Sequence, residues 1–322
     1  MSRRAALLLV PLAGGVALAC WLLVTVDLRA TVGVLERVSP AGLGALLALS
    51  AVTHLVLAGR LALFLRAADA TVPLVTLVGQ RLAAFAVSYA TPGPQVGGEP
   101  VQALLLARAG VPLATGAAAL VADRALEGLT TAVVLSGLAG VTCLRGVVPA
   151  ATLAALAPLW LVLVAMGAAY LVGARPLAAL HRRRLLRGAL GETLAHAEAR
   201  TVTLLGRTPG LLPRAVARSA LGWLLAGVEV WLVAASLGVS LSGLDVTAVL
   251  AAARLAILLP VPAGLGTFEA AHVVAFEALG LGAGPGLACA AVVRGRDVLA
   301  ACAGAGVALL AARRPRTTVA SP

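Results

Sequence analysis

Thr91-Pro92-Gly93-Pro94-Gln95-Val96-Gly97-Gly98-Glu99 has a counterpart later in the chain, Pro262-Ala263-Gly264-Leu265-Gly266-Thr267-Phe268-Glu269. Both copies run from a proline, through small residues, to a glutamate seven positions later. The two glutamates lie 170 residues apart, and the same offset aligns Arg124 with Arg294. Because proline, glutamate and arginine are scarce in this chain, their agreement at one spacing predicts an internal repeat.

The composition around these stretches is that of a membrane protein. Of 322 residues, 61% are hydrophobic and only 12% are charged, which leaves too little polar surface for a water-soluble domain. The net charge of +12 comes from arginines in short blocks between apolar runs. Such blocks orient membrane helices, and without interleaved aromatic residues they do not indicate a nucleic-acid partner.

Apolar runs of spanning length divide the chain into segments. A bilayer core of about 30 Å needs about 20 residues of helix. Runs of that length occur at about 5–26, 43–65, 113–142, 148–173, 219–238 and 285–311. Two further apolar regions, 72–110 and 245–282, are interrupted by the two Pro/Gly/Glu stretches.

Loop charge predicts the topology, because short Arg-rich loops stay in the cytoplasm. Arg66, the basic loop 174–218 and the Arg-rich C-terminus are then cytoplasmic, as is the N-terminus. Region 72–110 must enter and leave on the cytoplasmic side, and region 245–282 on the opposite side. If each region instead crossed twice, the chain would cross ten times, but segment 100–112 is too short for a crossing.

The predicted fold is therefore an all-α polytopic membrane protein that forms a single integral membrane domain over residues 1–322. It has about six spanning helices and two re-entrant helical hairpins. The repeats cover approximately 43–142 and 213–311, and their opposite insertion makes an inverted repeat, as in many secondary transporters.

Charged residues at membrane depth are the candidates for function, since each costs about 3 kcal/mol at the bilayer centre. The predicted substrate pathway comprises Glu99, Asp123, Arg124, Glu127, Glu269, Arg294 and Asp297. The predicted hairpin tips comprise Pro92, Gly93, Gly97, Gly98, Pro262, Gly264 and Gly266. Further charges at this depth are Arg60, Arg81, Glu229, Arg254 and Arg296.

The spacing of these residues suggests how they interact. Arg124 and Glu127 share a helix face, and Arg294 and Asp297 repeat that spacing. We expect the hairpin tips to meet near the midplane, where glutamates and arginines pair across the repeat and release one another as a headgroup passes. Arginine suits a phosphate because its planar guanidinium binds it bidentately. The alternative is structural: internal ion pairs that neutralise one another, and glutamates that cap their own helices.

Motifs for other chemistry are absent from the sequence. The four cysteines and four histidines have no metal-ligand spacing, so we expect no metal and no cofactor. The glycine-rich stretch lacks GK[ST], and no serine sits in a nucleophile motif. The sequence therefore does not predict an enzyme.

Both Pro/Gly/Glu stretches, Asp123-Arg124 and Arg294 resemble the lysylphosphatidylglycerol synthase transmembrane region family, also called flippase-like domain proteins. The resemblance implies a multi-pass protein of the bacterial plasma membrane that moves an amphiphilic lipid between leaflets, similar to the flippase half of the multiple peptide resistance factor. It marks Glu99, Asp123, Arg124, Glu269 and Arg294 as functional. Ala263 stands where the family usually has glycine, and Gln95 interrupts a usual glycine pair.

The expected function is movement of an anionic or zwitterionic phospholipid, or a polyprenyl-linked lipid, between leaflets. The expected partners are membrane lipids, with a separate lipid-modifying enzyme or glycosyltransferase as a further possibility. The alternatives are a non-transporting membrane partner of such an enzyme and a membrane-embedded lipid transferase.

Overall fold

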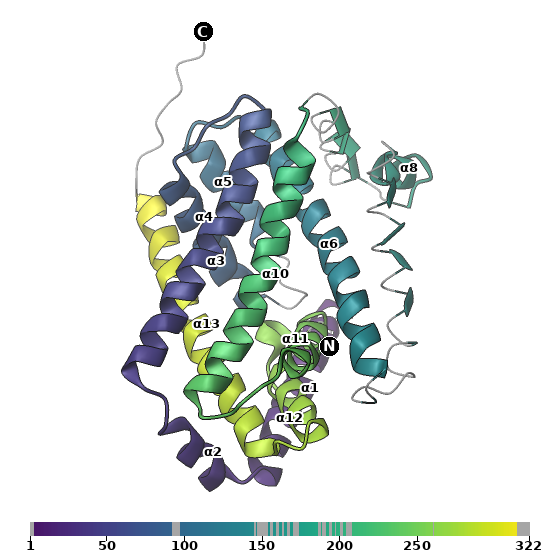
Figure 1. Cartoon of the computed structure of the whole chain (residues 1–322). Coiled ribbons are helices and arrows are strands. Elements are labelled where there is room, and N and C mark those ends of the chain that lie inside the picture. The colour runs from purple at the N-terminus through teal and green to yellow at the C-terminus, as the bar shows by residue number, and fades with distance from the viewer. Residues whose placement is uncertain are drawn as a thin grey trace.

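The computed structural model describes residues 3–91, 97–144, 208–259 and 261–313, together with 174–185 and short pieces between 146 and 203. The described chain is helical and contains no strand (Figure 1). Its helices are α1 (Arg3–Thr25), α2 (Leu28–Leu35), α3 (Pro40–Ala67), α4 (Leu74–Ala90), α5 (Glu99–Arg108), α6 (Leu113–Leu144), α8 (Pro176–Arg182), α10 (Leu211–Ser236), α11 (Gly243–Ile257), the 3-10 helix η1 (Pro262–Gly264), α12 (Thr267–Ala278) and α13 (Ala283–Arg313).

Four of the described helices, α3, α6, α10 and α13, are long and apolar enough to cross a membrane. The shortest, α10, has 26 residues, or about 39 Å at 1.5 Å per residue. The predicted segments 43–65, 113–142 and 285–311 coincide with α3, α6 and α13. The predicted segment 148–173 lies outside the continuously described residues.

The first predicted span, 5–26, is helix α1, and the chain then turns sharply. The axis of α2 is bent by 90° from the axis of α1, so the pair counts as a fifth span only if it is one broken crossing. Asp27 at the bend accepts hydrogen bonds from the backbone N–H groups of Arg29 (2.9 Å) and Ala30 (3.1 Å). This N-cap starts α2 in its new direction.

The predicted segment 219–238 corresponds to helix α10. Its predicted start was wrong by eight residues, because α10 begins at Leu211. The last residues of the predicted basic loop 174–218 are therefore helical. Arg218, which suggested a loop, donates from Nη1 to the Gly59 carbonyl at 3.0 Å. A long arginine side chain is tolerated at a helix end because its head reaches polar groups while its stem covers apolar surface.

The first broken region, 72–110, forms an antiparallel helical hairpin. Near its tip the Gly98 N–H donates to Ser88 Oγ at 2.9 Å, and farther down Gln80 Nε2 donates to the Leu105 carbonyl at 3.0 Å. The two helices touch at Gly98, where a Cβ would lie 2.1 Å from the Ala84 carbonyl oxygen. With 17 and 10 residues, α4 and α5 are shorter than a crossing requires.

The second broken region, 245–282, folds in the same way from the other end of the bundle. A capping box between Ser242 and Asp245 starts α11, and near the tip Thr267 Oγ1 donates to the Ala256 carbonyl at 3.5 Å. In Figure 1, α4 and α5 occupy the upper half of the molecule, whereas α11 and α12 occupy the lower half. Both broken regions thus form helical hairpins inside the bundle.

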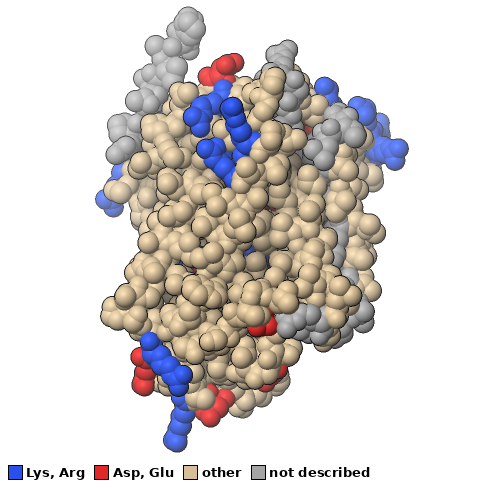
Figure 2. Space-filling view, viewed as in Figure 1, with Lys and Arg blue, Asp and Glu red and all other residues tan. Residues whose placement is uncertain are grey.

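The two predicted repeats, 43–142 and 213–311, are called the two halves of the molecule below. They pack closely through α4 of the first half and α13 of the second. Gly304 of α13 approaches α4 so closely that a Cβ would lie 2.0 Å from the Leu82 carbonyl oxygen. Small residues bring membrane helices together in this way. The visible face carries its charges at both ends, with a broad and almost uncharged band between them (Figure 2). Such a band is what a membrane-embedded protein presents to lipid.

Candidate functional site

A cavity of about 180 Å³ lies between the two halves and is lined by α3, α4, α6, α10, α11, α12 and α13. Its polar lining consists of Ser50, Thr53, His54, Arg81, Glu127, Glu229, Arg254, His272, Arg296 and Asp297. The remaining lining is apolar and includes Phe85 and Phe268. Both hairpins and all four candidate spans therefore contribute to one cavity.

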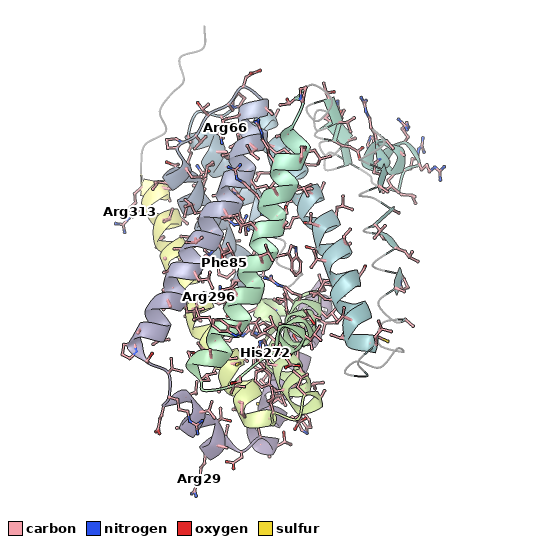
Figure 3. The ribbon with its side chains drawn as sticks, in the orientation of Figure 1. Arg29, Arg66, Phe85, His272, Arg296 and Arg313 are labelled. Atoms are coloured by element: carbon pink, nitrogen blue, oxygen red, sulfur yellow. The ribbon has the colours of Figure 1, made fainter. Side chains whose placement is uncertain are left out.

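The cavity lies at half the depth of the bundle. Its residues on α3 fall between Ser50 and Leu57, near the middle of Pro40–Ala67. Figure 3 shows Phe85 and Arg296 between Arg66 and Arg313 at one end and Arg29 at the other. A charged group at this depth needs a partner or a polar cavity.

Arg60 of α3 is the centre of the most buried ion-pair cluster. Its Nε and Nη2 donate to the two Asp123 carboxylate oxygens at 2.6 and 3.0 Å, and Nη2 also donates to Glu127 at 2.7 Å. Nη1 donates to Ser219 of α10 at 3.0 Å. Arg60 and Asp123 are each only 1% exposed. This cluster ties α3, α6 and α10 together, and it supports a structural role for Asp123.

Arg124 faces the first hairpin from α6. Its Nη1 lies 3.0 Å from Glu127, which confirms the predicted pairing on one helix face. Its Nε lies 3.7 Å from Glu99, too far for a hydrogen bond. Glu99 instead accepts from the N–H of Gly97, which precedes the helix, at 2.9 Å. No side chain among the described residues caps the start of α5, so the capping alternative was wrong for Glu99.

Arg294 of α13 holds the break of the second hairpin. Its Nε donates to Glu269 at 2.7 Å, while Nη2 donates to the Gly264 carbonyl at 2.8 Å and Nη1 to the Ala263 carbonyl. The guanidinium also lies over the Phe268 ring, 4.6 Å from its centroid. A single arginine thus satisfies backbone carbonyls that the broken helix leaves free.

The tips of the two hairpins meet at this arginine. Arg294 Nη1 lies 3.3 Å from the hydroxyl oxygen of Tyr89, in the last turn of α4. Ser88 and Tyr89 of the first hairpin line a small pocket together with Ala263 and Gly264 of the second. The end of α4 therefore contacts the break of the second hairpin, whereas residues 92–96 of the predicted first tip lie outside the described residues.

The expected pairing across the repeat was wrong for both glutamates. Glu99 faces Arg124 and Glu269 faces Arg294, so each glutamate lies near the arginine of its own half. The reason is that each hairpin packs against the long helix that follows it, which brings residues 25 positions apart into contact in each half.

The predicted pairing of Arg294 with Asp297 was also wrong. Asp297 lies 3.0 Å from its neighbour Arg296, which also binds Glu229 of α10 at 2.7 Å. Arg294 is directed towards the hairpin carbonyls, so its guanidinium is engaged elsewhere. The offset that aligns Arg124 with Arg294 therefore does not carry over to their ion pairs.

The glycines at the tips have the backbone that breaks a helix. Gly264 and Gly266 have φ of 61° and 75°, and Gly97 has φ of 150°. Ala263 also has a positive φ of 53°, which is unfavourable for a residue with a Cβ and explains why glycine suits this position. Pro262 begins η1, whereas Pro92 and Gly93 lie outside the described residues.

Only Glu127 and Asp297 of the predicted pathway line the large cavity. The other charged groups in its lining were not among the predicted pathway residues; they are Arg81, Glu229, Arg254 and Arg296. The signal that identifies them is the same: a charge within an apolar segment at membrane depth.

A comparison with known protein families supports the resemblance that the sequence motifs indicate. The profile of the family described as "Lysylphosphatidylglycerol synthase TM region" matches residues 5–304, nearly the whole chain. No curated protein and no solved structure matches the chain significantly. On the profile match and the helical, apolar architecture together, this membrane-embedded chain belongs to the lysylphosphatidylglycerol synthase transmembrane region family.

Proposed function

We propose that this protein moves a lipid between the two leaflets of the bacterial plasma membrane. The observation that carries the proposal is the cavity at half depth, which both re-entrant hairpins line with charged side chains. The lipid is an anionic or zwitterionic phospholipid or a polyprenyl-linked lipid. Family membership supports an association with lipid flipping or modification.

The hairpins are the moving parts in this proposal. None of the four hairpin helices, which have 17, 10, 15 and 12 residues, is long enough to cross a bilayer. Irregular backbone at membrane depth is tolerated where it lines a cavity. The element order of long helix, hairpin, long helix occurs twice, which supports the inverted repeat. Rocking of one half against the other opens the cavity to each side in turn, while the acyl tails remain in lipid.

Ion pairs around the cavity give the headgroup its path. Arg296 binds Glu229 and Asp297, and Glu127 is shared by Arg60 and Arg124. A charged headgroup exchanges for one member of such a pair, so a charge is never left alone in low dielectric. The protein itself transfers no chemical group in this scheme and works beside a separate lipid-modifying enzyme.

We further propose that the end of the bundle with Arg66 and Arg313, which lies opposite Arg29 in Figure 3, faces the cytoplasm. Loop charge in the sequence assigns both termini to the cytoplasm as well. Cysteine labelling tests this orientation in a background without the four native cysteines. A membrane-impermeant reagent should modify Gln95→Cys and Leu265→Cys from opposite sides. Modification of both from one side would contradict the topology.

A leaflet-accessibility assay in proteoliposomes tests the function. Labelled phosphatidylglycerol, phosphatidylcholine and a polyprenyl phosphate are reconstituted with the wild type, Glu269→Gln, or Glu277→Gln. Glu277 lies exposed on the same helix as Glu269 and is the matched control. The wild type and the control should scramble at least one lipid, and Glu269→Gln should do so on the order of tenfold more slowly, since it loses a charge-assisted bond.

The alternatives predict other outcomes of this assay. A non-transporting partner protein would leave the labelled lipids as slow to exchange as in protein-free vesicles. A lipid transferase would yield a chemically changed lipid in the same vesicles. Either result would overturn the transport proposal.

A further inference from the structure

The arginines near the cavity fall into two groups. Arg60, Arg124, Arg294 and Arg296 each lie within 4.0 Å of at least one carboxylate. Arg81 of α4 and Arg254 of α11 also line the cavity, yet the structure gives neither guanidinium an ion pair or hydrogen bond with a described residue. Arg254 instead lies over the Trp223 ring, 5.2 Å from its centroid.

The carboxylates in the cavity lining are already engaged by other arginines. Glu127 binds Arg60 at 2.7 Å and Arg124 at 3.0 Å. Glu229 and Asp297 both bind Arg296, at 2.7 and 3.0 Å. Among the described residues, Arg81 and Arg254 thus have no carboxylate within ion-pair distance, and a charge at membrane depth without a close partner favours an anion from outside the chain.

A third polar group in the lining also has a free hydrogen-bonding position. The buried Nδ1 of His54, on α3, has no hydrogen-bond partner among the described residues. The His54 ring lies edge-on to Phe85, which is on the same helix as Arg81. The cavity therefore presents uncommitted polar groups from α3 and from the first helix of each hairpin.

We propose that Arg81 and Arg254 form an anion site that binds the phosphate group of a lipid headgroup, with His54 as a further contact. This inference rests on the proposed function and names the chemical group that it recognises. A guanidinium binds phosphate bidentately and stays charged in a low-dielectric cavity. Because Arg81 belongs to the first hairpin and Arg254 to the second, one phosphate links the two hairpins at half depth.

The size of the cavity fits this assignment. Its volume of about 180 Å³ is several times the ~30 Å³ that one water molecule occupies in the liquid. This space is large enough for a phosphate with a small substituent. We therefore expect the site to recognise the phosphate ester and not to distinguish between different headgroup alcohols attached to that phosphate.

Binding measurements on the purified full chain in non-ionic detergent test the proposal. Trp223 lies beside Arg254, so its fluorescence should change when a ligand binds. Isothermal titration calorimetry is the second readout, and it is repeated with Trp223→Phe, which lacks this fluorophore. The probes are dihexanoyl phosphatidylglycerol, dihexanoyl phosphatidylcholine, inorganic phosphate and uncharged dihexanoylglycerol. We expect both phosphate esters to bind, the uncharged lipid not to bind, and inorganic phosphate to bind more weakly.

The variants are Arg81→Gln and Arg254→Gln, with the exposed Arg29→Gln as matched control. Each cavity variant should weaken phosphate-ester binding on the order of tenfold or more, the size of a lost charge-assisted hydrogen bond. Arg29→Gln should bind like the wild type. Because Arg81→Gln removes no internal ion pair or hydrogen bond, it should melt no lower than the wild type. Arg254→Gln should lose at most the contribution of its cation–π contact with Trp223.

Several outcomes would overturn the proposal. Unchanged binding in both cavity variants, or equal binding of dihexanoylglycerol, would show that no phosphate site exists there. Equal affinity for inorganic phosphate would assign the site to the free ion. A large drop in thermal stability of Arg81→Gln would show that its guanidinium has a structural partner.

The experiment also separates this inference from the proposed function. If the wild type binds phosphate esters through both arginines but scrambles no lipid, the transport proposal fails and the anion site remains. If the wild type scrambles lipid and both variants bind and scramble equally well, the anion site fails and the transport proposal remains.

Discussion

Arg60 and Arg294 both stabilise the bundle, but through different kinds of contact. Arg60 joins three long helices through Asp123, Glu127 and Ser219, and it is 1% exposed. Arg294 binds one carboxylate and the backbone carbonyls of a broken helix, and it is 16% exposed. The difference shows that Arg60 fixes the packing of long helices, whereas Arg294 fixes the tip of a hairpin.

Removing Arg60 should have the largest effect on stability. Arg60→Met leaves the buried Asp123 carboxylate without its bidentate partner, and breaking a buried pair in this way costs about 3–5 kcal/mol. We expect a strongly lowered melting temperature and poor recovery of monodisperse protein in detergent. Thermal unfolding followed by size-exclusion chromatography measures both.

A double variant checks the cause of that effect. Arg60→Met combined with Asp123→Leu removes both buried charges and should regain part of the lost stability. If Arg60→Met melts like the wild type, the cluster does not fix the helix packing and the contrast with Arg294 disappears.

Removing Arg294 should affect the hairpin tip more than the global fold. Arg294→Gln keeps a hydrogen-bonding group but loses the charge that pairs with Glu269, at a cost of about 1.5–3 kcal/mol. The tip should then open more often. A thiol reagent should modify Leu265→Cys several-fold faster in this variant, in a background free of the four native cysteines.

Arg294→Lys refines the same prediction. A lysine keeps the charge but lacks the planar fork that reaches Glu269 and Gly264 together, so its labelling rate should be intermediate. Equal labelling rates in all three proteins would show that Arg294 does not restrain the tip.

Removing Arg124 should have the smallest effect, although Arg124 corresponds to Arg294 in the repeat. Arg124 is one-third exposed, its partner Glu127 keeps Arg60, and Glu99 lies 3.7 Å away. We expect Arg124→Gln to cost about 1 kcal/mol or less, which thermal unfolding resolves as a small shift. If Arg124→Gln lowered the free energy of unfolding as much as Arg60→Met, Arg124 would be as important for helix packing as Arg60, which would contradict this prediction.

Local features of the structure could be predicted from the sequence because they depend on neighbouring residues. The lengths of α3, α6 and α13 follow from uninterrupted apolar runs, and the breaks follow from proline and glycine. The pair Arg124 and Glu127 follows from helical spacing alone. The start of α10 did not follow, because arginines near its beginning resemble a loop, and only the tertiary structure brings Arg218 to the Gly59 carbonyl of α3.

Ion pairs between helices could not be predicted in the same way. Arg60 lies 63 residues before Asp123, and no local spacing connects them. The partners of Arg294 and Arg296 also differ, although these residues are only two positions apart. Which carboxylate each arginine meets depends on how the helices are rotated about their axes.

The sequence by itself determined that this chain is a helical membrane protein with two broken regions, since apolar length and helix breakers act along the chain. Only the tertiary structure decided which glutamate meets which arginine, and it gives Arg81 and Arg254 no ion pair with a described residue. The physical reason is that the apolar residues of α3 and α13 are spread around the whole helix, so the sequence prefers no particular face. Their rotation is set by close packing, such as Gly304 against Leu82, and that packing places the charges around the cavity.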